Sequence, residues 1–167
     1  DVSCSVAIHN LMLTDAELEG FDTRFKLMPP LREISDQKAL IKGIKDGTID
    51  MVTSDHQPMD IEHKKMEFEH AAHGSIGLET AYGSLCALFD NQAAATLLGK
   101  GKERFGIQQQ PIAVGEKADF SLFSPKGKTT VQKENIISSS KNSAYLGKEI
   151  PGTVYGVVNN GKLHLND

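Results

Sequence analysis

Two side chains that can do chemistry, Asp55 and His56, directly follow a short apolar run at residues 49–53. A carboxylate at the end of a buried strand can bind a divalent metal ion or move a proton. The structural alternative is that Asp55 caps a loop or a helix, as aspartate often does. In extended backbone the adjacent His56 side chain points the other way. We therefore expect His56 to orient a backbone group rather than share a ligand role with Asp55.

The remaining histidines give weaker signals. His9 and Asn10 end another predicted strand, and a lone histidine is more often a satisfied polar residue than a metal ligand. His63, His70 and His73 lie in a charged segment, where the last two are spaced to share a helical face. No third partner stands at the spacing of a zinc site, so a self-contained zinc site is not expected.

The two cysteines and the lysine pair of the same segment are interpreted structurally. Cys4 and Cys86 have no C-x-x-C partner and are each predicted to be a small buried hydrophobic residue. Lys64 and Lys65 are interpreted as a solvated pair. The sequence contains no phosphate-binding loop, dinucleotide-binding fingerprint or serine-hydrolase elbow.

The composition is that of an ordinary globular chain. It has 167 residues, 39% hydrophobic and 24% charged, which is one domain by length and enough to bury a core. The formal net charge of −4 leaves no excess of positive charge to hold a phosphate backbone, so nucleic acid is not an expected partner. No apolar run approaches about 18 residues, so no membrane span is expected. Two cysteines are too few for a disulfide framework, which favours a cytoplasmic location.

Hydrophobic periodicity predicts the elements that position these residues. The first part alternates strand and helix: strand 2–8, helix 14–18 with a capping box from Thr14, helix 35–45 begun by Ser35 and ended by Gly47, strand 49–53, loop 59–74, and helices 76–88 and 92–105. After about residue 106 the pattern becomes β: strands 118–123, 129–131 and 154–158, a hairpin turn at 159–161, and strand 162–165. Alternating strands and helices predict a parallel sheet, and chemistry in such sheets sits at the carboxyl ends of the strands.

Several segments taken together resemble dihydroorotase, a family of the amidohydrolase superfamily. They are Phe25–Arg32 with its Pro-Pro-Leu-Arg, Asp46–Asp50, Thr53–Pro58 with its Ser-Asp-His-x-Pro, and Gly77–Thr80, in the order and at close to the spacing of the family. Gly115–Asp119, Ser140–Asn142 and Gly152–Val154 are similar to its C-terminal part. The resemblance covers essentially the whole chain.

The resemblance implies an α/β fold class, namely the C-terminal part of a (β/α)₈ TIM barrel followed by a small β-sandwich unit. Residues 1–106 would be the last two βα units of the barrel, and residues 107–167 the small β unit. A whole barrel takes about 250 residues, and the chain opens on Asp1 directly in a predicted strand. We therefore expect a fragment of a longer protein that associates with the missing barrel portion or forms a homo-oligomer.

The resemblance also implies an activity and a cofactor. Dihydroorotases use one or two zinc ions to interconvert carbamoyl aspartate and dihydroorotate in pyrimidine biosynthesis. Asp55 matches the aspartate of the eighth strand, which contacts the metal and carries the proton, and His73-Gly74 matches a loop that contacts substrate through its backbone. His9 matches a position that is not a usual metal ligand. Most ligands of the family lie outside this sequence, so the isolated chain is expected to be inactive.

Three departures from the family keep other functions open. Met28 stands where the family has a substrate-binding asparagine, Met59 where it has a second histidine that contacts substrate, and Asn10 where histidine is commoner. A thioether is a weak acceptor and no donor. One alternative is an inactive homologue that acts as a scaffold for aspartate transcarbamoylase. Another is an amidohydrolase for a different cyclic amide, such as a hydantoin.

Overall fold

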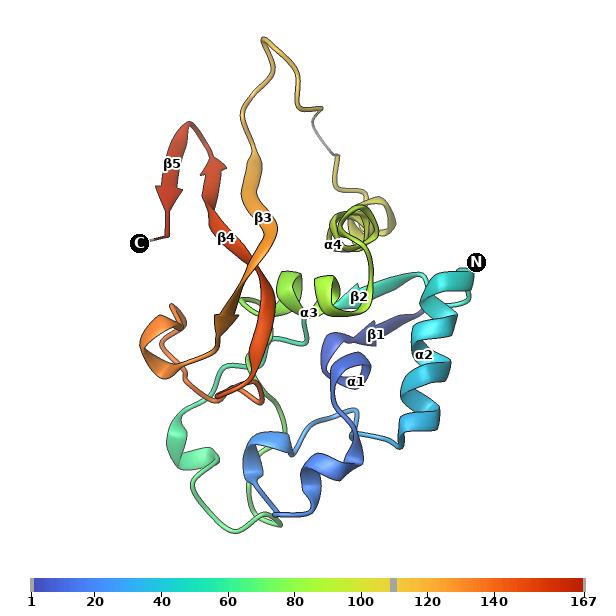
Figure 1. Ribbon diagram of the computed structural model, residues 1–167, viewed down its shortest axis with the longest axis vertical. Coiled ribbons are helices and arrows are strands. Elements are labelled where there is room, and N and C mark those ends of the chain that lie inside the picture. Colours follow the sequence, from blue (N-terminus) through green and yellow to red (C-terminus); the bar gives the residue numbers. More distant parts are fainter. Residues whose placement is uncertain (1, 109–110, 167) are drawn as a thin grey trace.

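The α/β part of the molecule comes first along the chain (Figure 1). The computed structural model describes residues 2–108 and 111–166. The α-helices and strands of this part are β1 (Ser5–Ala7), α1 (Ile8–Met12), α2 (Ile34–Asp46), β2 (Met51–Thr53), α3 (Ala81–Leu88) and α4 (Asn91–Arg104). Single turns of 3₁₀-helix lie between them: η1 (Asp15–Leu18), η2 (Thr23–Phe25) and η3 (Ile61–His63). The α/β class predicted from the alternation of elements is confirmed.

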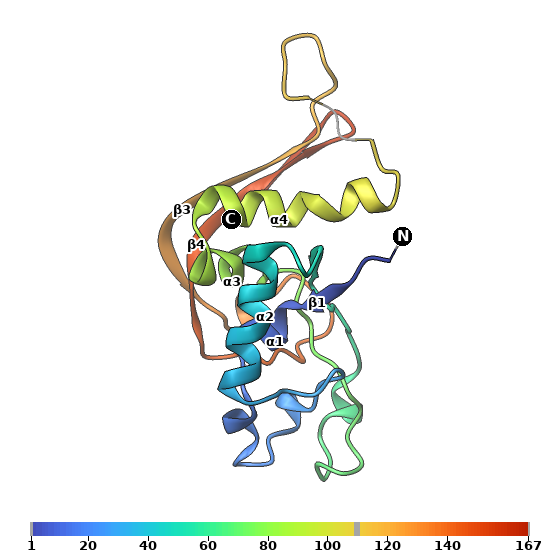
Figure 2. The ribbon, with the colours of Figure 1, turned by 90° about the vertical axis from the view of Figure 1, so that its right-hand side faces the viewer.

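The two short strands of this part are parallel, as the alternating pattern predicts. Val6 of β1 lies opposite Val52 of β2, and the chain crosses between the strands through α1 and α2. The carboxyl ends of parallel strands lie at the same edge of the sheet. The loops that follow β1 and β2 accordingly extend to the same end of the molecule in both views (Figure 1, Figure 2).

The later part of the chain forms a three-stranded antiparallel sheet in the order β3–β4–β5. Its elements are β3 (Phe120–Thr130), the 3₁₀ turn η4 (Lys133–Asn135), β4 (Glu149–Asn159) and β5 (Lys162–Leu165). Asn160 and Gly161 both have positive φ, 49° and 74°, which is the geometry of the predicted tight hairpin turn. β3 is one bulged strand where two were expected. The described residues form one sheet here, so the second layer of a β-sandwich stays a prediction.

Two hydrophobic cores hold these parts together. One lies between the parallel strands and helices α1, α2, α3 and α4, and is built from Val6, Ile8, Leu11, Ile44, Leu85, Ala94 and Leu97. The other joins the loops after β1 to the later chain, and is built from Leu13, Phe25, Leu27, Leu31, Ile76, Val131, Ile136, Ala144, Tyr145 and Ile150. Packing therefore crosses the boundary expected near residue 106, because residues 131–150 bury their apolar side chains against the first part.

Several boundaries differ from the sequence expectation for local reasons. β1 ends at Ala7 because helix α1 begins at Ile8, which is fully buried. Helix α3 begins at Ala81 rather than at residue 76. Gly77 packs so closely that a Cβ there would overlap the Ser54 carbonyl oxygen, and the N–H groups of Gly77 and Leu78 donate to the His56 side chain.

The helix caps were predicted with mixed success. Thr14 precedes η1 but makes no side-chain cap hydrogen bond. Ser35 lies inside α2, whose N-cap is Glu33. Gly47 ends α2 with a φ of 80°, as predicted for a glycine after a helix. None of the helices in the described part of the chain is long and apolar enough to span a membrane.

Candidate functional site

Asp55 lies just past the carboxyl end of β2 and is half-buried. Its φ of 45° is in the left-handed region, which aspartate adopts more readily than most non-glycine residues but still rarely. Its carboxylate Oδ1 accepts a hydrogen bond of 2.8 Å from Nε2 of Gln57. Backbone conformations of this kind are costly and cluster at functional sites. The turn thus presents a fixed carboxylate at the edge of the sheet where the predicted chemistry belongs.

Gln57 connects this turn to a second one. Its N–H donates to the Ser75 carbonyl at 2.9 Å, and the adjacent His56 forms a parallel bridge with Ser75. Gly74 has a φ of 119°, and a Cβ at this glycine would lie 2.5 Å from Oε1 of Gln57. The structure therefore brings Asp55 and Gly74 to opposite sides of the Gln57 side chain. Sequence reasoning missed Gln57 because nothing local to it signals a contact with residue 74.

His56 has the orienting role expected of it. Its Nδ1 accepts the backbone N–H groups of Gly77 at 3.4 Å and Leu78 at 3.3 Å. A ring nitrogen that accepts carries no proton, so neutral His56 is protonated on Nε2. The imidazole thereby fixes the start of the turn that leads into α3.

One buried amide side chain holds both turns from below. Nδ2 of Asn142, a residue only 4% exposed, donates to the Gln57 carbonyl at 3.1 Å and to the Gly74 carbonyl at 3.5 Å. The Ser140 hydroxyl contacts Oδ1 of Asn142 and donates to the Met59 carbonyl at 2.7 Å. In the sequence, the Ser-Lys-Asn segment at residues 140–142 is distinguished only by its resemblance to the family. Its contact with the site was not foreseen, because the bonded residues lie 68 to 85 positions apart.

A second set of buried hydrogen bonds continues beneath Asp55. The Ser75 hydroxyl accepts the Ala144 N–H at 2.9 Å, and Nδ1 of His9 lies 3.2 Å from the Tyr145 hydroxyl. Burial lowers the pKa of His9, against the opposing effect of the Asp55 carboxylate and of nearby backbone carbonyls. Burial raises the pKa of Tyr145. Tyr145 therefore keeps its proton and His9 is neutral near pH 7, which makes His9 a residue of the core beneath the site.

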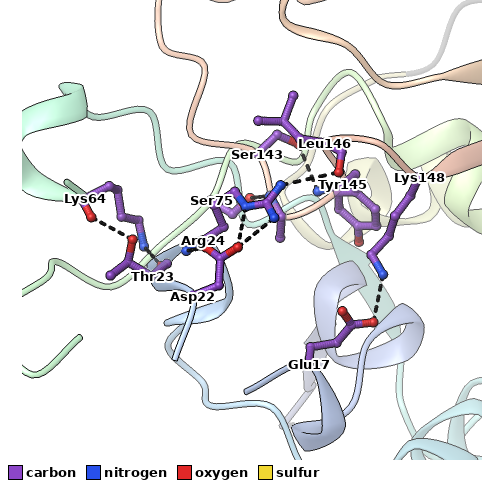
Figure 3. Close-up of polar contacts among 11 residues, drawn as sticks. Glu17, Asp22, Thr23, Arg24, Lys64, Ser75, Ser143, Tyr145, Leu146 and Lys148 are labelled. Atoms are coloured by element: carbon purple, nitrogen blue, oxygen red, sulfur yellow. Dashed lines mark hydrogen bonds and ion pairs between the residues drawn. The ribbon is translucent and has the colours of Figure 1, made fainter. Parts of the chain in front are cut away.

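The prediction that Lys64 and Lys65 are both solvated is correct for Lys65 only. Lys65 is exposed, but Lys64 is 4% exposed. Nζ of Lys64 donates to three carbonyls: Thr23 at 2.9 Å, Lys26 at 3.1 Å and Ala72 at 2.8 Å. Figure 3 shows Lys64 beside Thr23. The solvated interpretation of Lys64 is therefore wrong. Its long side chain crosses from its own loop to the η2 segment, a contact that no local pattern encodes.

The other predicted residues are placed as follows. His73 is exposed, while the N–H of Gly74 donates to the Lys26 carbonyl at 2.9 Å. Asn10 is buried and donates to the Pro30 carbonyl at 2.9 Å. Met28 is 53% exposed.

Cys4 is exposed, so its interpretation as a buried hydrophobic residue is wrong. It precedes β1, and its Sγ lies 3.4 Å from the Thr48 carbonyl oxygen. Cys86 is half-buried against the apolar core between the strands and α1, α2, α3 and α4.

The described residues do not form a metal site by themselves. Over residues 2–108 and 111–166 no three His, Cys, Asp or Glu side chains converge as metal ligands would. His70 instead lies 3.1 Å from the carboxylate of its neighbour Glu69, and His63 is exposed. Catalytic zinc usually takes three protein ligands, and of the predicted ligands this part of the chain supplies Asp55.

Comparison with known proteins supports the resemblance to dihydroorotases. The dihydroorotase of Caldicellulosiruptor saccharolyticus is 38% identical over 174 residues, which span 100% of this chain and 40% of that protein. The chain is homologous to the C-terminal part of dihydroorotases. The dihydroorotase of Bacillus subtilis is 34% identical over 97% of the chain and 40% of its own length. The chain thus spans about two fifths of the length of the curated relatives it matches. No protein-family model matches it.

Solved structures share the fold of this dihydroorotase-like chain. An L-hydantoinase (dihydropyrimidinase) from Arthrobacter aurescens superposes with a TM-score of 0.86 at 24% identity, over 98% of this chain and 39% of that one. An inactive dihydroorotase-like domain of a CAD-like multifunctional protein from Chaetomium thermophilum gives a TM-score of 0.66 at 20% identity, over 97% and 43%. At these identities the likeness establishes the fold, which is that of a portion of each protein.

Proposed function

We propose that this chain is the C-terminal portion of a cytoplasmic zinc-dependent cyclic amidohydrolase that interconverts carbamoyl aspartate and dihydroorotate in pyrimidine biosynthesis. The observation that carries the proposal is the Asp55 carboxylate at the end of β2, in a chain 38% identical to a dihydroorotase. In this proposal residues 1–106 supply the last two βα units of a (β/α)₈ barrel. Residues 107–167 supply part of a small β-sandwich unit, whose other strands come from elsewhere in the protein.

Zinc would be held only in part by this chain. Asp55 is the proposed ligand, and the others would come from the remaining barrel, because the described residues do not make a complete site. When bound, zinc lowers the pKa of a coordinated water toward neutrality. The contribution of this chain is then to hold a carboxylate beside that water. The Gln57 hydrogen bond and the left-handed backbone of Asp55 both fix its position.

The proposed chemistry is a proton transfer by Asp55. Its carboxylate accepts a proton from the attacking water, whose oxygen forms a bond to the ring carbonyl carbon. The carbon–nitrogen bond of the ring then breaks, and Asp55 returns the proton to the leaving nitrogen. Ring closure is the same sequence in reverse. The backbone of the His73-Gly74 turn, on the other side of Gln57, is the proposed contact for substrate.

The test is hydrolysis of dihydroorotate by the full-length zinc-loaded protein. Removal of a positioned acid–base group typically costs about 10² to 10⁴ in rate, so Asp55→Asn should lose turnover by that factor. Asp60→Asn is the matched control, because Asp60 is exposed a few residues along and makes no side-chain cap hydrogen bond to η3. Full turnover in the Asp55→Asn protein would rule out this role.

A non-catalytic function has its own observations. Met28 and Met59 stand where the resembled family has hydrogen-bonding side chains, and one solved structure with this fold is an inactive dihydroorotase-like domain. On this alternative the chain acts as a scaffold for aspartate transcarbamoylase. A folded, zinc-loaded protein without turnover that binds aspartate transcarbamoylase would favour it.

A different ring is the second alternative. The half-exposed thioether of Met28 offers an apolar contact in place of an amide, and a hydantoinase shares the fold. Turnover of a hydantoin with none of dihydroorotate would favour this substrate class.

A further inference from the structure

Lys64 is a buried cation that takes no part in the proposed chemistry. It lies in the loop that runs from η3 to the His73-Gly74 turn, and its side chain reaches back to the η2 segment beside Thr23 (Figure 3). Its three carbonyl partners belong to two segments. Thr23 and Lys26 follow β1, and Ala72 follows β2. One ammonium group therefore ties together the loops that leave the two parallel strands.

The hydrogen bonds around Lys64 converge on the proposed substrate-contact turn. The Lys26 carbonyl accepts both Nζ of Lys64, at 3.1 Å, and the N–H of Gly74, at 2.9 Å. The Ala72 carbonyl accepts Nζ of Lys64 at 2.8 Å, and the Ala72 N–H donates to the His63 carbonyl at 2.9 Å. Both neighbours of His73 are thus fixed by groups that Lys64 bonds or adjoins.

The charge environment shows that this position is not favourable for a cation by itself. Burial, and to a smaller extent the charge of Lys26, lower the pKa of Lys64 to about 8 against the opposing effect of Asp22. Asp22 is itself paired with Arg24 at 2.6 Å. Lys65, the sequence neighbour of Lys64, is exposed. An apolar side chain would fill such a space without the cost of desolvating an ammonium group, so the three directed hydrogen bonds are what the lysine adds.

We propose that Lys64 is a positioning residue whose three hydrogen bonds hold the Ala72–Gly74 turn in the conformation that receives the ring substrate through its backbone. The inference rests on the proposed function for its substrate and on the hydrogen bonds for its geometry. Lys64 acts through the turn, and the groups that touch substrate belong to the turn itself.

The first arm of the test measures the turn without reference to activity. Amide hydrogen exchange at Ala72 and Gly74 should quicken about tenfold or more in Lys64→Met, because donors to two carbonyls of that network are lost. Lys65→Met is the matched control, the same substitution one residue along at an exposed position. Exchange at Leu85, in the core of α3, reports whether the whole fold is kept. Lys64→Gln replaces Lys64→Met if the latter does not fold.

The second arm measures substrate affinity in the full-length zinc-loaded protein. Lys64→Met should raise KM for dihydroorotate about tenfold and leave kcat within about threefold, since the reacting groups are untouched. Lys64→Arg keeps the cation and should recover part of the loss, and Lys65→Met should match wild type. Unchanged exchange at Ala72 and Gly74, or faster exchange with an unchanged KM, would overturn the proposal. If the wild-type protein turns over no cyclic amide, the proposed function is wrong. The hydrogen-exchange measurement then shows separately whether Lys64 fixes the turn.

Discussion

The two turns of the candidate site are supported in physically different ways. Below them lies the site floor, where Ser75, Asn142 and Tyr145 make hydrogen bonds between neutral, buried groups. Beside them lies the site wall, where Lys26 and Lys64 bond backbone carbonyls with ammonium groups. Neutral buried bonds keep their geometry across a wide pH range. Ammonium groups reach across loops that have little core of their own, and their effect depends on protonation. We therefore expect the floor to contribute more to global stability, and the wall to contribute less, in a way that depends on pH, and to govern local order in the turns.

The largest expected effect comes from breaking the floor at Asn142. Asn142→Asp removes the amide donors to the Gln57 and Gly74 carbonyls and places a carboxyl group against two oxygens. Lost donors and a buried acid together should lower the free energy of unfolding by about 4 kcal/mol, measured by denaturant titration. Asn91→Asp is the control, because Asn91 is exposed at the start of α4. Equal stability of the two variants would show that the floor does not hold the site.

A smaller effect is expected from titrating the wall. Lys64 has its pKa lowered from 10.5 to about 8 by burial, so between these values the unfolded chain binds the proton that the folded chain has lost. The contribution of Lys64 to the free energy of unfolding should therefore be lowest below pH 8 and rise by about 3 kcal/mol up to pH 10.5. The measurement is the difference between wild type and Lys64→Met across that window. A difference that is flat, or that falls, would contradict a desolvated ammonium group.

The smallest of the three effects is expected where floor and wall meet. Gly74 donates its N–H to the wall at Lys26 and offers its carbonyl to the floor at Asn142. Gly74→Ala requires an L-residue at a φ of 119° and a Cβ against Gln57, which should cost about 1–2 kcal/mol. Gly20→Ala is the control, since nothing lies within 4 Å of a Cβ there. A stable Gly74→Ala protein with unchanged exchange along the turn would mean that this crossing point is not tightly fixed.

What the sequence predicted well was encoded locally. The parallel strands, the glycine that ends α2, the Asn160-Gly161 hairpin and the orienting role of His56 each follow from neighbouring residues. The position of Asp55 after a strand is of the same kind. The short apolar run at residues 49–53 identifies the strand, and the polar residues after it mark its end.

What the sequence did not reveal depends on partners far along the chain. Asn142 bonds the backbone of a residue 85 positions away, and Lys64 bonds Lys26 across 38 positions. A lysine in a charged segment looks solvated until another loop surrounds it. The Asn142 contact is equally hidden in the sequence, because nothing in a Ser-Lys-Asn segment shows whether its asparagine is buried and bonded to distant backbone or lies in a surface turn. The roles assigned to Asp55, His73 and Gly74 stay predictions, supported for Asp55 and Gly74 by their contacts with Gln57.

The packing of residues 131–150 against the first part of the chain has a consequence for synthesis of the protein. A ribosome synthesises Asp55 and both site turns long before Asn142 and Tyr145. Until that late segment emerges, the nascent chain carries the candidate site with no support under it and with half of one core exposed. The site is therefore completed only after residues 131–150 have been synthesised, and a product that terminates early in the β region would hold Asp55, His73 and Gly74 in a form that quality-control proteases can recognise.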